Sequence, residues 1–316
     1  MTERENALRA FARKKPEWIP SARKSVDYIL PSAIRERNNG GNDWFGAYWE
    51  DNMVPGESLL YEDMGELAEK IKFPDVTAVD WERLAKSDLE KADRANKVIF
   101  LTILVGPFER LPAMIPFDAA LCAFDIYPEE TAEYMRRMEQ HKLELIRLVL
   151  KHYKPDVICL NDDYGYVKNL FFSPATWAEF FKPSLMKFND LIHKGGALAA
   201  LHSCGKVETL IPEFISSGVD IWDSVNACND LSECSRKYGS QITFSPGLDQ
   251  QGVTAVDGCT IEQAKEETRR TIDQLAGHGG LIIRPEQPRV PQDIIDACFE
   301  EIESYGKTYY QLHPIL

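Results

Sequence analysis

The residues best suited to chemistry in this chain are His202 and Cys204, two positions apart in the run Ala199-Ala200-Leu201-His202-Ser203-Cys204-Gly205. Along a β-strand, residues i and i+2 point to the same side, so an imidazole and a thiol at this spacing can face one ion. Both groups are ordinary zinc ligands. The apolar run before His202 predicts a short buried strand, and Gly205 predicts a loop after it. The pattern indicates a zinc site at a strand end, with a core histidine beside an inert buried cysteine as the alternative.

A catalytic zinc needs at least one further protein ligand and one open position. Glu286 is the first candidate, because it follows a late apolar run and a carboxylate oxygen binds zinc readily beside imidazole and thiolate. Asp223 and then Cys228 come next. Asp223 follows the predicted strand after the His202 strand, so it could ligate the metal or orient the imidazole instead.

Length and composition restrict the class of protein. The 316 residues exceed a typical single core but suit an α/β barrel, which often reaches this size as one domain. Apolar residues make up 44% of the chain and charged residues 27%, which is typical of a globular protein with a large core. The formal net charge of −14 disfavours a general affinity for nucleic acid or acidic membranes.

The lack of a recognisable membrane helix or secretory signal, together with the cysteine usage, predicts a cytoplasmic protein. No apolar run approaches the roughly 20 residues of a membrane helix, and the charged start MTERENALRAFARKK is unlike a secretory signal. The seven cysteines are odd in number and scattered, so we expect reduced thiols and no disulfide framework. The sequence leaves a homodimer open.

Short apolar runs alternate with amphipathic helical patterns, which is typical of βα units around a parallel sheet. Helices are predicted over 3–15, 128–152 and 261–278. The predicted strands are Val76 to Val79, Val98 to Val105, Val157 to Leu160, Ala197 to Leu201, Val219 to Trp222, Ile242 to Ser245 and Leu281 to Ile283. With an eighth strand expected near the N-terminal stretch, these units most simply close into a (β/α)8 TIM barrel. An open doubly wound sheet would normally carry a GxGxxG turn, which the sequence lacks.

The first stretch of the chain differs from the rest. Residues 1–70 combine an Arg/Lys-rich helix, a proline-containing connection and the aromatic cluster Asp43-Trp44-Phe45-Gly46-Ala47-Tyr48-Trp49. We therefore predict an N-terminal helical and aromatic cap over 1–70 and the barrel over 71–316, together forming one structural domain. The aromatic rings of Trp44 and Tyr48 could wall a substrate pocket or simply pack within the cap.

Polar residues follow the predicted strands, where a barrel places its active site. Asp162 and Asp163 are adjacent, and two carboxylates this close cannot both be buried as anions without a partner. Either they enter the pocket, or Asp162 caps the next helix while Asp163 is solvated. Asp249 allows the same two interpretations. Arg284 could contact an anionic substrate group.

Several motifs, taken in order, resemble a known family. They are Asn161-Asp162-Asp163-Tyr164-Gly165, Phe172-Ser173-Pro174, Phe181-Lys182-Pro183, His202-Ser203-Cys204-Gly205, Ser245-Pro246-Gly247-Leu248-Asp249-Gln250 and Val290-Pro291. Together they resemble the uroporphyrinogen decarboxylase superfamily, specifically its corrinoid-dependent methyltransferase branch, from about residue 43 onward. The resemblance implies a (β/α)8 barrel. Residues 1–60 lack the arginine-rich motif with which true uroporphyrinogen decarboxylases grip their substrate, whereas the histidine-cysteine pair is similar to zinc-binding methyltransferases.

The resemblance implies an enzyme of the O-demethylase type. It would move a methyl group from a small donor, most plausibly an aromatic methyl ether, to the cobalt of a separate corrinoid (cobalamin) protein. A zinc ion at the ether oxygen would stabilise the charge that develops there. The sequence has no DxHxxG histidine loop of the kind that binds corrinoid cobalt, so the corrinoid is expected on a partner protein.

This mechanism also predicts roles for residues that do not bind the zinc ion. Asp162, Asp163 or Tyr164 would orient the ring substituents or supply a proton. The aromatic residues Trp44, Tyr48 and Phe108 would exclude water. Asp249 and Arg284 are further candidates for contact with the substrate.

Three alternatives stay open. A coenzyme M-like thiol acceptor is disfavoured, because those enzymes place a third cysteine ligand near the end of a late strand and residues 281–286 contain none. A metal-free decarboxylase would use Asp162 or Asp163 and an arginine such as Arg284 to hold carboxylates. A non-catalytic binding barrel is disfavoured by the concentration of ionisable groups at the strand ends.

Overall fold

Six parallel strands form the centre of the computed structural model, which describes residues 1–51, 55–57, 59–286 and 289–316. Their order across the sheet is β1-β4-β5-β6-β7-β8. The strands are β1 (Val26–Ile29), β4 (Val98–Ile103), β5 (Val157–Asn161), β6 (Leu198–His202), β7 (Ile221–Val225) and β8 (Thr243–Pro246). A separate antiparallel pair consists of β2 (Gly41–Asn42) and β3 (Tyr48–Trp49).

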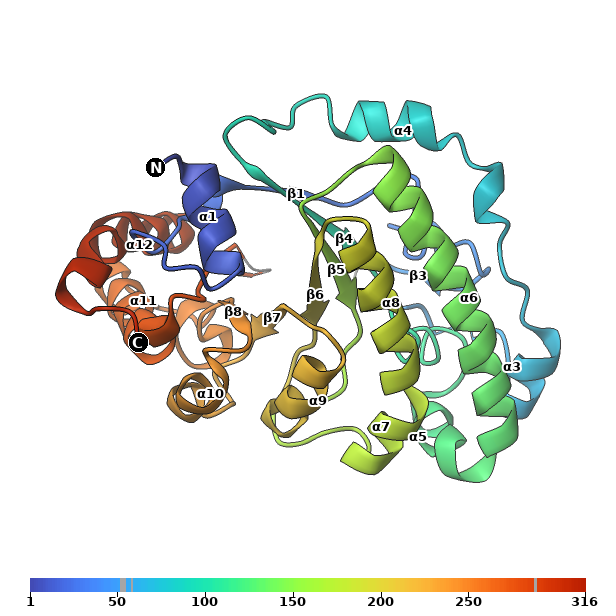
Figure 1. The fold of residues 1–316 in the computed structure, drawn as a ribbon. Coiled ribbons are helices and arrows are strands. Elements are labelled where there is room, and N and C mark those ends of the chain that lie inside the picture. The colour runs from blue at the N-terminus through green and yellow to red at the C-terminus, as the bar shows by residue number, and fades with distance from the viewer. Residues whose placement is uncertain (52–54, 58, 287–288) are drawn as a thin grey trace.

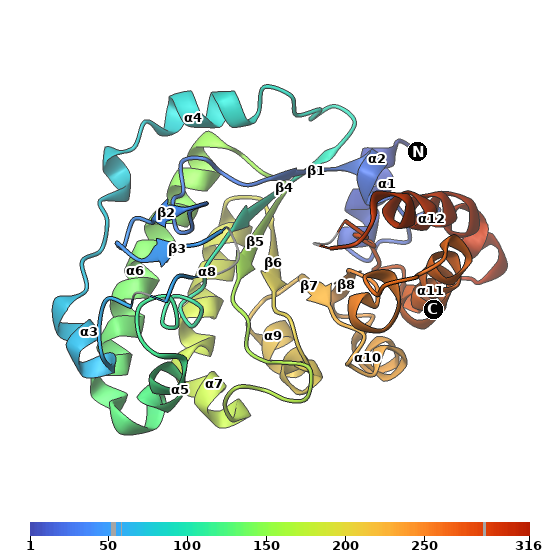
Figure 2. The ribbon, with the colours of Figure 1, turned by 180° about the vertical axis from the view of Figure 1, so that it is seen from behind.

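Helices surround the sheet (Figures 1 and 2). The α-helices are α1 (Glu3–Phe11), α2 (Ala22–Ser25), α3 (Met64–Lys70), α4 (Trp81–Asp88), α5 (Phe117–Ile126), α6 (Pro128–His152), α7 (Pro174–Phe180), α8 (Lys182–Lys194), α9 (Ile211–Ser216), α10 (Leu231–Tyr238), α11 (Ile261–Leu275) and α12 (Gln292–Leu312). Shorter helical turns are η1 (Val76–Ala78), η2 (Glu208–Leu210), η3 (Gln250–Thr254) and η4 (Ala276–His278).

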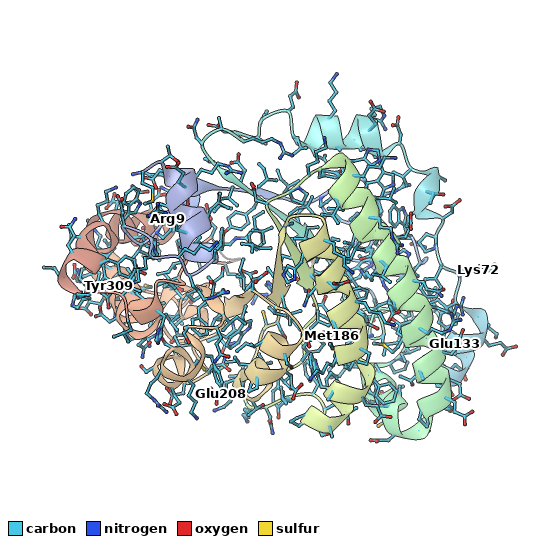
Figure 3. The ribbon with its side chains drawn as sticks, viewed as in Figure 1. Arg9, Lys72, Glu133, Met186, Glu208 and Tyr309 are labelled. Carbon is cyan, nitrogen blue, oxygen red and sulfur yellow. The ribbon has the colours of Figure 1, made fainter. Side chains whose placement is uncertain are left out.

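The apolar strands are buried because helices cover the sheet. Every residue of β5, β7 and β8 is buried, as expected for a parallel sheet that helices cover. Helix α6 packs on α8, and α8 in turn contacts β6. Figure 3 labels Glu133 on α6 and Met186 on α8, both exposed, on this helical layer. Both chain termini lie on the side of α11 and α12 (Figure 1).

The two edges of the curled sheet are linked by the segment 281–283. Leu281 forms a parallel bridge with Phe244 of β8, and Ile283 forms one with Ser21, which precedes β1. The Ile282 N–H donates to the Phe244 carbonyl at 3.1 Å, and the Arg284 N–H donates to the Pro246 carbonyl at 3.0 Å. The predicted α/β class is confirmed. Among the described residues, however, this sheet has six regular strands rather than eight, and 281–283 makes only isolated bridges.

Most of the predicted elements match the structure to within a few residues. The helix predicted over 128–152 has those same bounds, and the strand expected near the N-terminal stretch is β1, which pairs with β4. The strand predicted over 76–79 is wrong. There the Asp75 carboxylate accepts the Thr77 N–H at 3.0 Å and starts the single turn η1. None of the helices in the described part of the chain has the length and apolarity that crossing a membrane would require.

Candidate metal centre

Four polar residues lie side by side across the carboxyl ends of four strands. In the sheet register, Asn161 of β5 pairs with His202 of β6, His202 with Asp223 of β7, and Asp223 with Ser245 of β8. Paired residues of neighbouring parallel strands point to the same side of the sheet. The register therefore forms a polar row, Asn161-His202-Asp223-Ser245, at the edge where the strands end.

Hydrogen bonds run along this row. His202 Nδ1 lies 2.8 Å from Asp223 Oδ2, and the Ser245 hydroxyl donates to Asp223 Oδ1 at 2.7 Å. Burial alone would raise the pKa of Asp223, but the hydrogen bond and charge of His202, together with Arg284 and Ser245, outweigh burial and lower that pKa. An ionised carboxylate only accepts, so Nδ1 carries the hydrogen and Nε2 is directed toward Cys204.

Cys204 lies two residues beyond β6 and contacts His202 directly. Its sulfur is 3.4 Å from His202 Nε2 and 3.2 Å from the Ser224 hydroxyl. Its backbone N–H donates to Asp163 Oδ1 at 2.7 Å. Asp163, the second residue after β5, is thereby held against the loop that carries the thiol.

Asp163, His202 and Cys204 form a cluster with the donor set of a zinc site. One carboxylate oxygen, one imidazole nitrogen and the sulfur all lie within 4.8 Å of one another, and all three residues are partly buried. Carboxylate, imidazole and thiolate are the three ligand types that zinc takes in proteins. The carboxylate at His202 Nδ1 is the outer partner that zinc-bound histidines normally have. The three residues therefore fit a zinc ion.

Negative groups dominate the charge around His202. Burial alone would lower the pKa of His202, but the Cys204 sulfur and the Asp223 carboxylate raise it well above its usual value. Surroundings that favour a positively charged imidazole also favour a metal cation.

Glu109 extends the site toward the next strand end. Asn161 Nδ2 donates to both of its carboxylate oxygens at 2.9 Å, and Arg37 Nη2 lies 3.3 Å from Glu109 Oε2. Burial, followed by the charge of Asp163, raises the pKa of Glu109. Glu109 thus places a second, largely buried carboxylate beside the cluster.

Asp162 faces away from Asp163 and into the protein. Its carboxylate accepts the backbone N–H groups of Phe108 at 3.2 Å and Glu109 at 2.9 Å, so it supports the loop after β4 and does not cap a following helix. Burial and the charge of Glu109 raise its pKa well above the usual range. Tyr164 is 2% exposed, hydrogen-bonds Asp162 and packs against Trp177. The structure therefore brings only Asp163 of the three predicted catalytic residues into the cluster.

The structure does not bring Glu286, the predicted third metal ligand, into the cluster. Glu286 is exposed, and the 281–283 segment before it lies next to β8, beyond β7 as counted from the His202 strand. Asp163, which follows β5, the immediate neighbour of β6, belongs to the cluster instead, so the identity of the third ligand stays a prediction. Asp223, predicted as a substitute ligand, instead orients His202.

Two predicted substrate contacts have packing or capping roles. Phe108 is 2% exposed, and its ring packs on Phe171 and Phe172, so it does not line an open pocket. Asp249 accepts the Gln251 and Gly252 N–H groups and so caps η3.

The other three predicted contacts lie in different environments. Trp44 lines a surface groove of about 520 Å³ and stacks with Arg35 at 5.6 Å; the groove lining includes none of the cluster residues. Tyr48 is 43% exposed on β3. Arg284 lies 4.1 Å from the ring centre of Tyr28 and helps to lower the pKa of Asp223, so it belongs to the surroundings of the site.

Sequence reasoning assigned no role to Glu109, Arg37, Asn161, Ser224 or Ser245. Glu109, Asn161 and Ser224 lie in the polar stretches that follow predicted strands, where a pocket is expected, but the strand pairing is needed to show which of these side chains meet. Arg37 carries no such signal, because the long N-terminal connection alone brings it to Glu109.

The fold and the cluster define an α/β protein with a polar site, whose donor set fits a metal ion, at the carboxyl ends of a curled parallel sheet. The model of the family Uroporphyrinogen decarboxylase (URO-D) matches residues 82–304, and the chain belongs to this family. No curated protein sequence matches the chain.

Solved structures support the fold. A methyltransferase from Methanosarcina mazei superposes with a TM-score of 0.72 at 14% identity, covering 96% of this chain and 99% of the other. A GH113 β-1,4-mannanase has a TM-score of 0.45 at 10% identity, and the match covers 97% of this chain and 93% of the mannanase chain. An L-ribulose 3-epimerase has a TM-score of 0.44 at 10% identity, and the match covers 91% of this chain and 96% of the epimerase chain. At these identities the likeness concerns the fold alone, and the last two scores are too low to support further comparison.

Proposed function

We propose that this protein is a zinc-dependent methyltransferase that moves a methyl group from a small donor, an aromatic methyl ether being favoured, to the cobalt of a separate corrinoid protein. The observation that carries the proposal is the Asp163-His202-Cys204 cluster at the carboxyl ends of the strands. Membership of the URO-D family and the fold shared with a methyltransferase are consistent with it. The same support favours a (β/α)8-type barrel as the parent architecture. The cap predicted over 1–70 would then be the part of that stretch outside β1, because β1 belongs to the central sheet.

Each residue of the cluster has a role in this proposal. His202, Cys204 and Asp163 would hold the zinc, and Asp223 with Ser245 would fix the imidazole so that Nε2 points at the metal. Zinc would supply Lewis-acid stabilisation of the negative charge that develops on the oxygen of a methyl ether as it loses its methyl group.

Residues next to the cluster would act on the donor molecule. Glu109 lies beside Asp163 and would accept a hydrogen bond from a substituent of the donor. Arg284, whose charge acts on Asp223, would face an anionic substituent. The corrinoid protein would approach over the strand ends, because the cluster lies there.

The first experiment is elemental analysis of tag-free protein beside a His202→Ala/Cys204→Ala double variant. We expect about one zinc per chain in the wild type and none in the variant. In a second step, zinc-loaded protein is mixed with cob(I)alamin and 2-methoxyphenol, and methylcobalamin formation is followed by its absorbance. Wild-type protein should form methylcobalamin and the double variant should not.

Two results would overturn the proposal. Wild-type protein that stays metal-free after zinc is supplied would favour a metal-free decarboxylase that uses Asp163 and Arg284. The zinc-loaded protein could also methylate a thiol such as coenzyme M from methylcobalamin without demethylating methyl ethers. That result would identify the protein as a methyltransferase with a thiol acceptor instead.

A further inference from the structure

The backbone of β7 is distorted at Ser224, next to the residue that orients His202. Ser224 has φ +58°, and the pairing of β7 with β8 shifts register between Asp223 and Val225. A positive φ is uncommon for a residue other than glycine and costs on the order of 1 kcal/mol or more. The fold maintains this strain at a buried position, since Ser224 is 6% exposed.

The distortion changes where the Ser224 side chain points. In a regular strand, successive side chains alternate, so Ser224 would face the side opposite to Asp223. A bulge re-aims a side chain in this way at strand ends beside active sites. Here it places the Ser224 hydroxyl 3.2 Å from the Cys204 sulfur.

Once a metal is bound, the chemistry of the two groups determines which of them donates the hydrogen bond. A metal-bound Cys204 is a thiolate and can only accept a hydrogen bond, so the Ser224 hydroxyl must donate. A hydroxyl donating to sulfur stabilises the thiolate and draws charge from it. The sulfur then passes less charge to the metal, which stays a stronger Lewis acid.

We infer that Ser224 is a positioning residue of the metal centre whose hydroxyl orients the Cys204 thiolate and limits the charge that it donates to the metal. This inference rests on the zinc site of the proposed function. The inference explains why the backbone of β7 is strained at Ser224. Placing Asp223 beside His202 would not by itself require that strain.

The test uses cobalt(II) in place of zinc, because the sulfur-to-cobalt charge-transfer band reports the electron density on the thiolate. In Ser224→Ala, we expect this band to move to longer wavelength and the metal affinity, measured by chelator competition, to fall about 10-fold. Ser224→Gly should show the same band shift although glycine accepts a positive φ without strain, since it also lacks the hydroxyl.

The matched control is Ser217→Ala, which removes a buried hydroxyl that donates to the Glu213 carbonyl, outside the cluster. Its charge-transfer band should stay where it is in the wild type. The inference is overturned if the Ser224→Ala and Ser224→Gly variants bind cobalt with an unshifted band, or if Ser217→Ala shifts the band equally. Failure of the wild type itself to bind cobalt or zinc would instead refute the proposed function, so the two failures are distinguishable.

Discussion

Asp223 holds His202 through a single hydrogen bond of 2.8 Å between Oδ2 and Nδ1. The bond joins adjacent strands at a paired position of the register, and Ser245 fixes the second oxygen of Asp223 from the next strand. His202 thus enters the site with its tautomer and ring orientation already determined.

Asp223→Asn should weaken zinc binding by about 10- to 100-fold, because an amide oxygen competes less well for the Nδ1 hydrogen and leaves the imidazole free to rotate. The measurement is zinc affinity by competition with a chromophoric chelator. Thermal unfolding of the zinc-free variant serves as the control for its folding. An unchanged affinity would mean that Asp223 does not orient His202.

Asp163→Asn should lower zinc content far more than Glu286→Gln, because Asp163 belongs to the cluster and Glu286 is exposed outside it. Asparagine can still accept the Cys204 N–H, so the substitution tests ligation more than loop structure. Zinc per chain is measured after dialysis against a weak chelator. A greater loss in Glu286→Gln would restore Glu286 as the third ligand.

Gly106→Ala should destabilise the protein by about 1–3 kcal/mol, the usual cost of overpacking. A Cβ at Gly106 would lie 2.2 Å from the Asp162 side chain, which would have to leave the backbone N–H groups that it accepts. Gly277→Ala is the matched control, because its nearest neighbour atom would be 3.8 Å away. Urea unfolding compares the two; equal free energies of unfolding would contradict the predicted clash.

A buried ion network should make the protein sensitive to acid. Glu36 binds Lys142 and His141, and Arg110 donates to its carbonyl. Burial opposes the ionisation of Glu36, but Lys142 and His141 outweigh it and lower the pKa of Glu36 from 4.5 to about 2. A depressed pKa in the folded state contributes stability above the unfolded value, and this contribution is lost as the pH falls from about 4.5 toward 2.

The substitution that tests this network is Glu36→Gln, which leaves the buried Lys142 without its counter-charge. We expect a loss of about 3–5 kcal/mol at neutral pH and a weaker dependence of stability on pH between 4.5 and 2 than in the wild type. Thermal unfolding across this range makes the measurement. The same acid dependence in both proteins would show that other carboxylates cause it.

Local sequence by itself determined the positions of most strands and the His202-Cys204 pair. Continuous apolar runs can be read as buried parallel strands, and a spacing of two residues places both ligands on one side as long as the chain stays extended. The fold class followed from the alternation of these runs with helices such as 128–152. One short run, 76–79, was mispredicted because the capping side chain of Asp75 competes locally with a strand.

The tertiary structure alone decided which carboxylates join the pair. Asp163 reaches Cys204 because β5 lies beside β6, whereas Glu286 follows a segment that bridges β8 to Ser21. Strand neighbours and bulges depend on contacts between residues far apart in the chain, and no local pattern encodes them. The strained turn at Ser224 and the meeting of Arg37 with Glu109 have the same origin, since each depends on packing that only the folded chain provides.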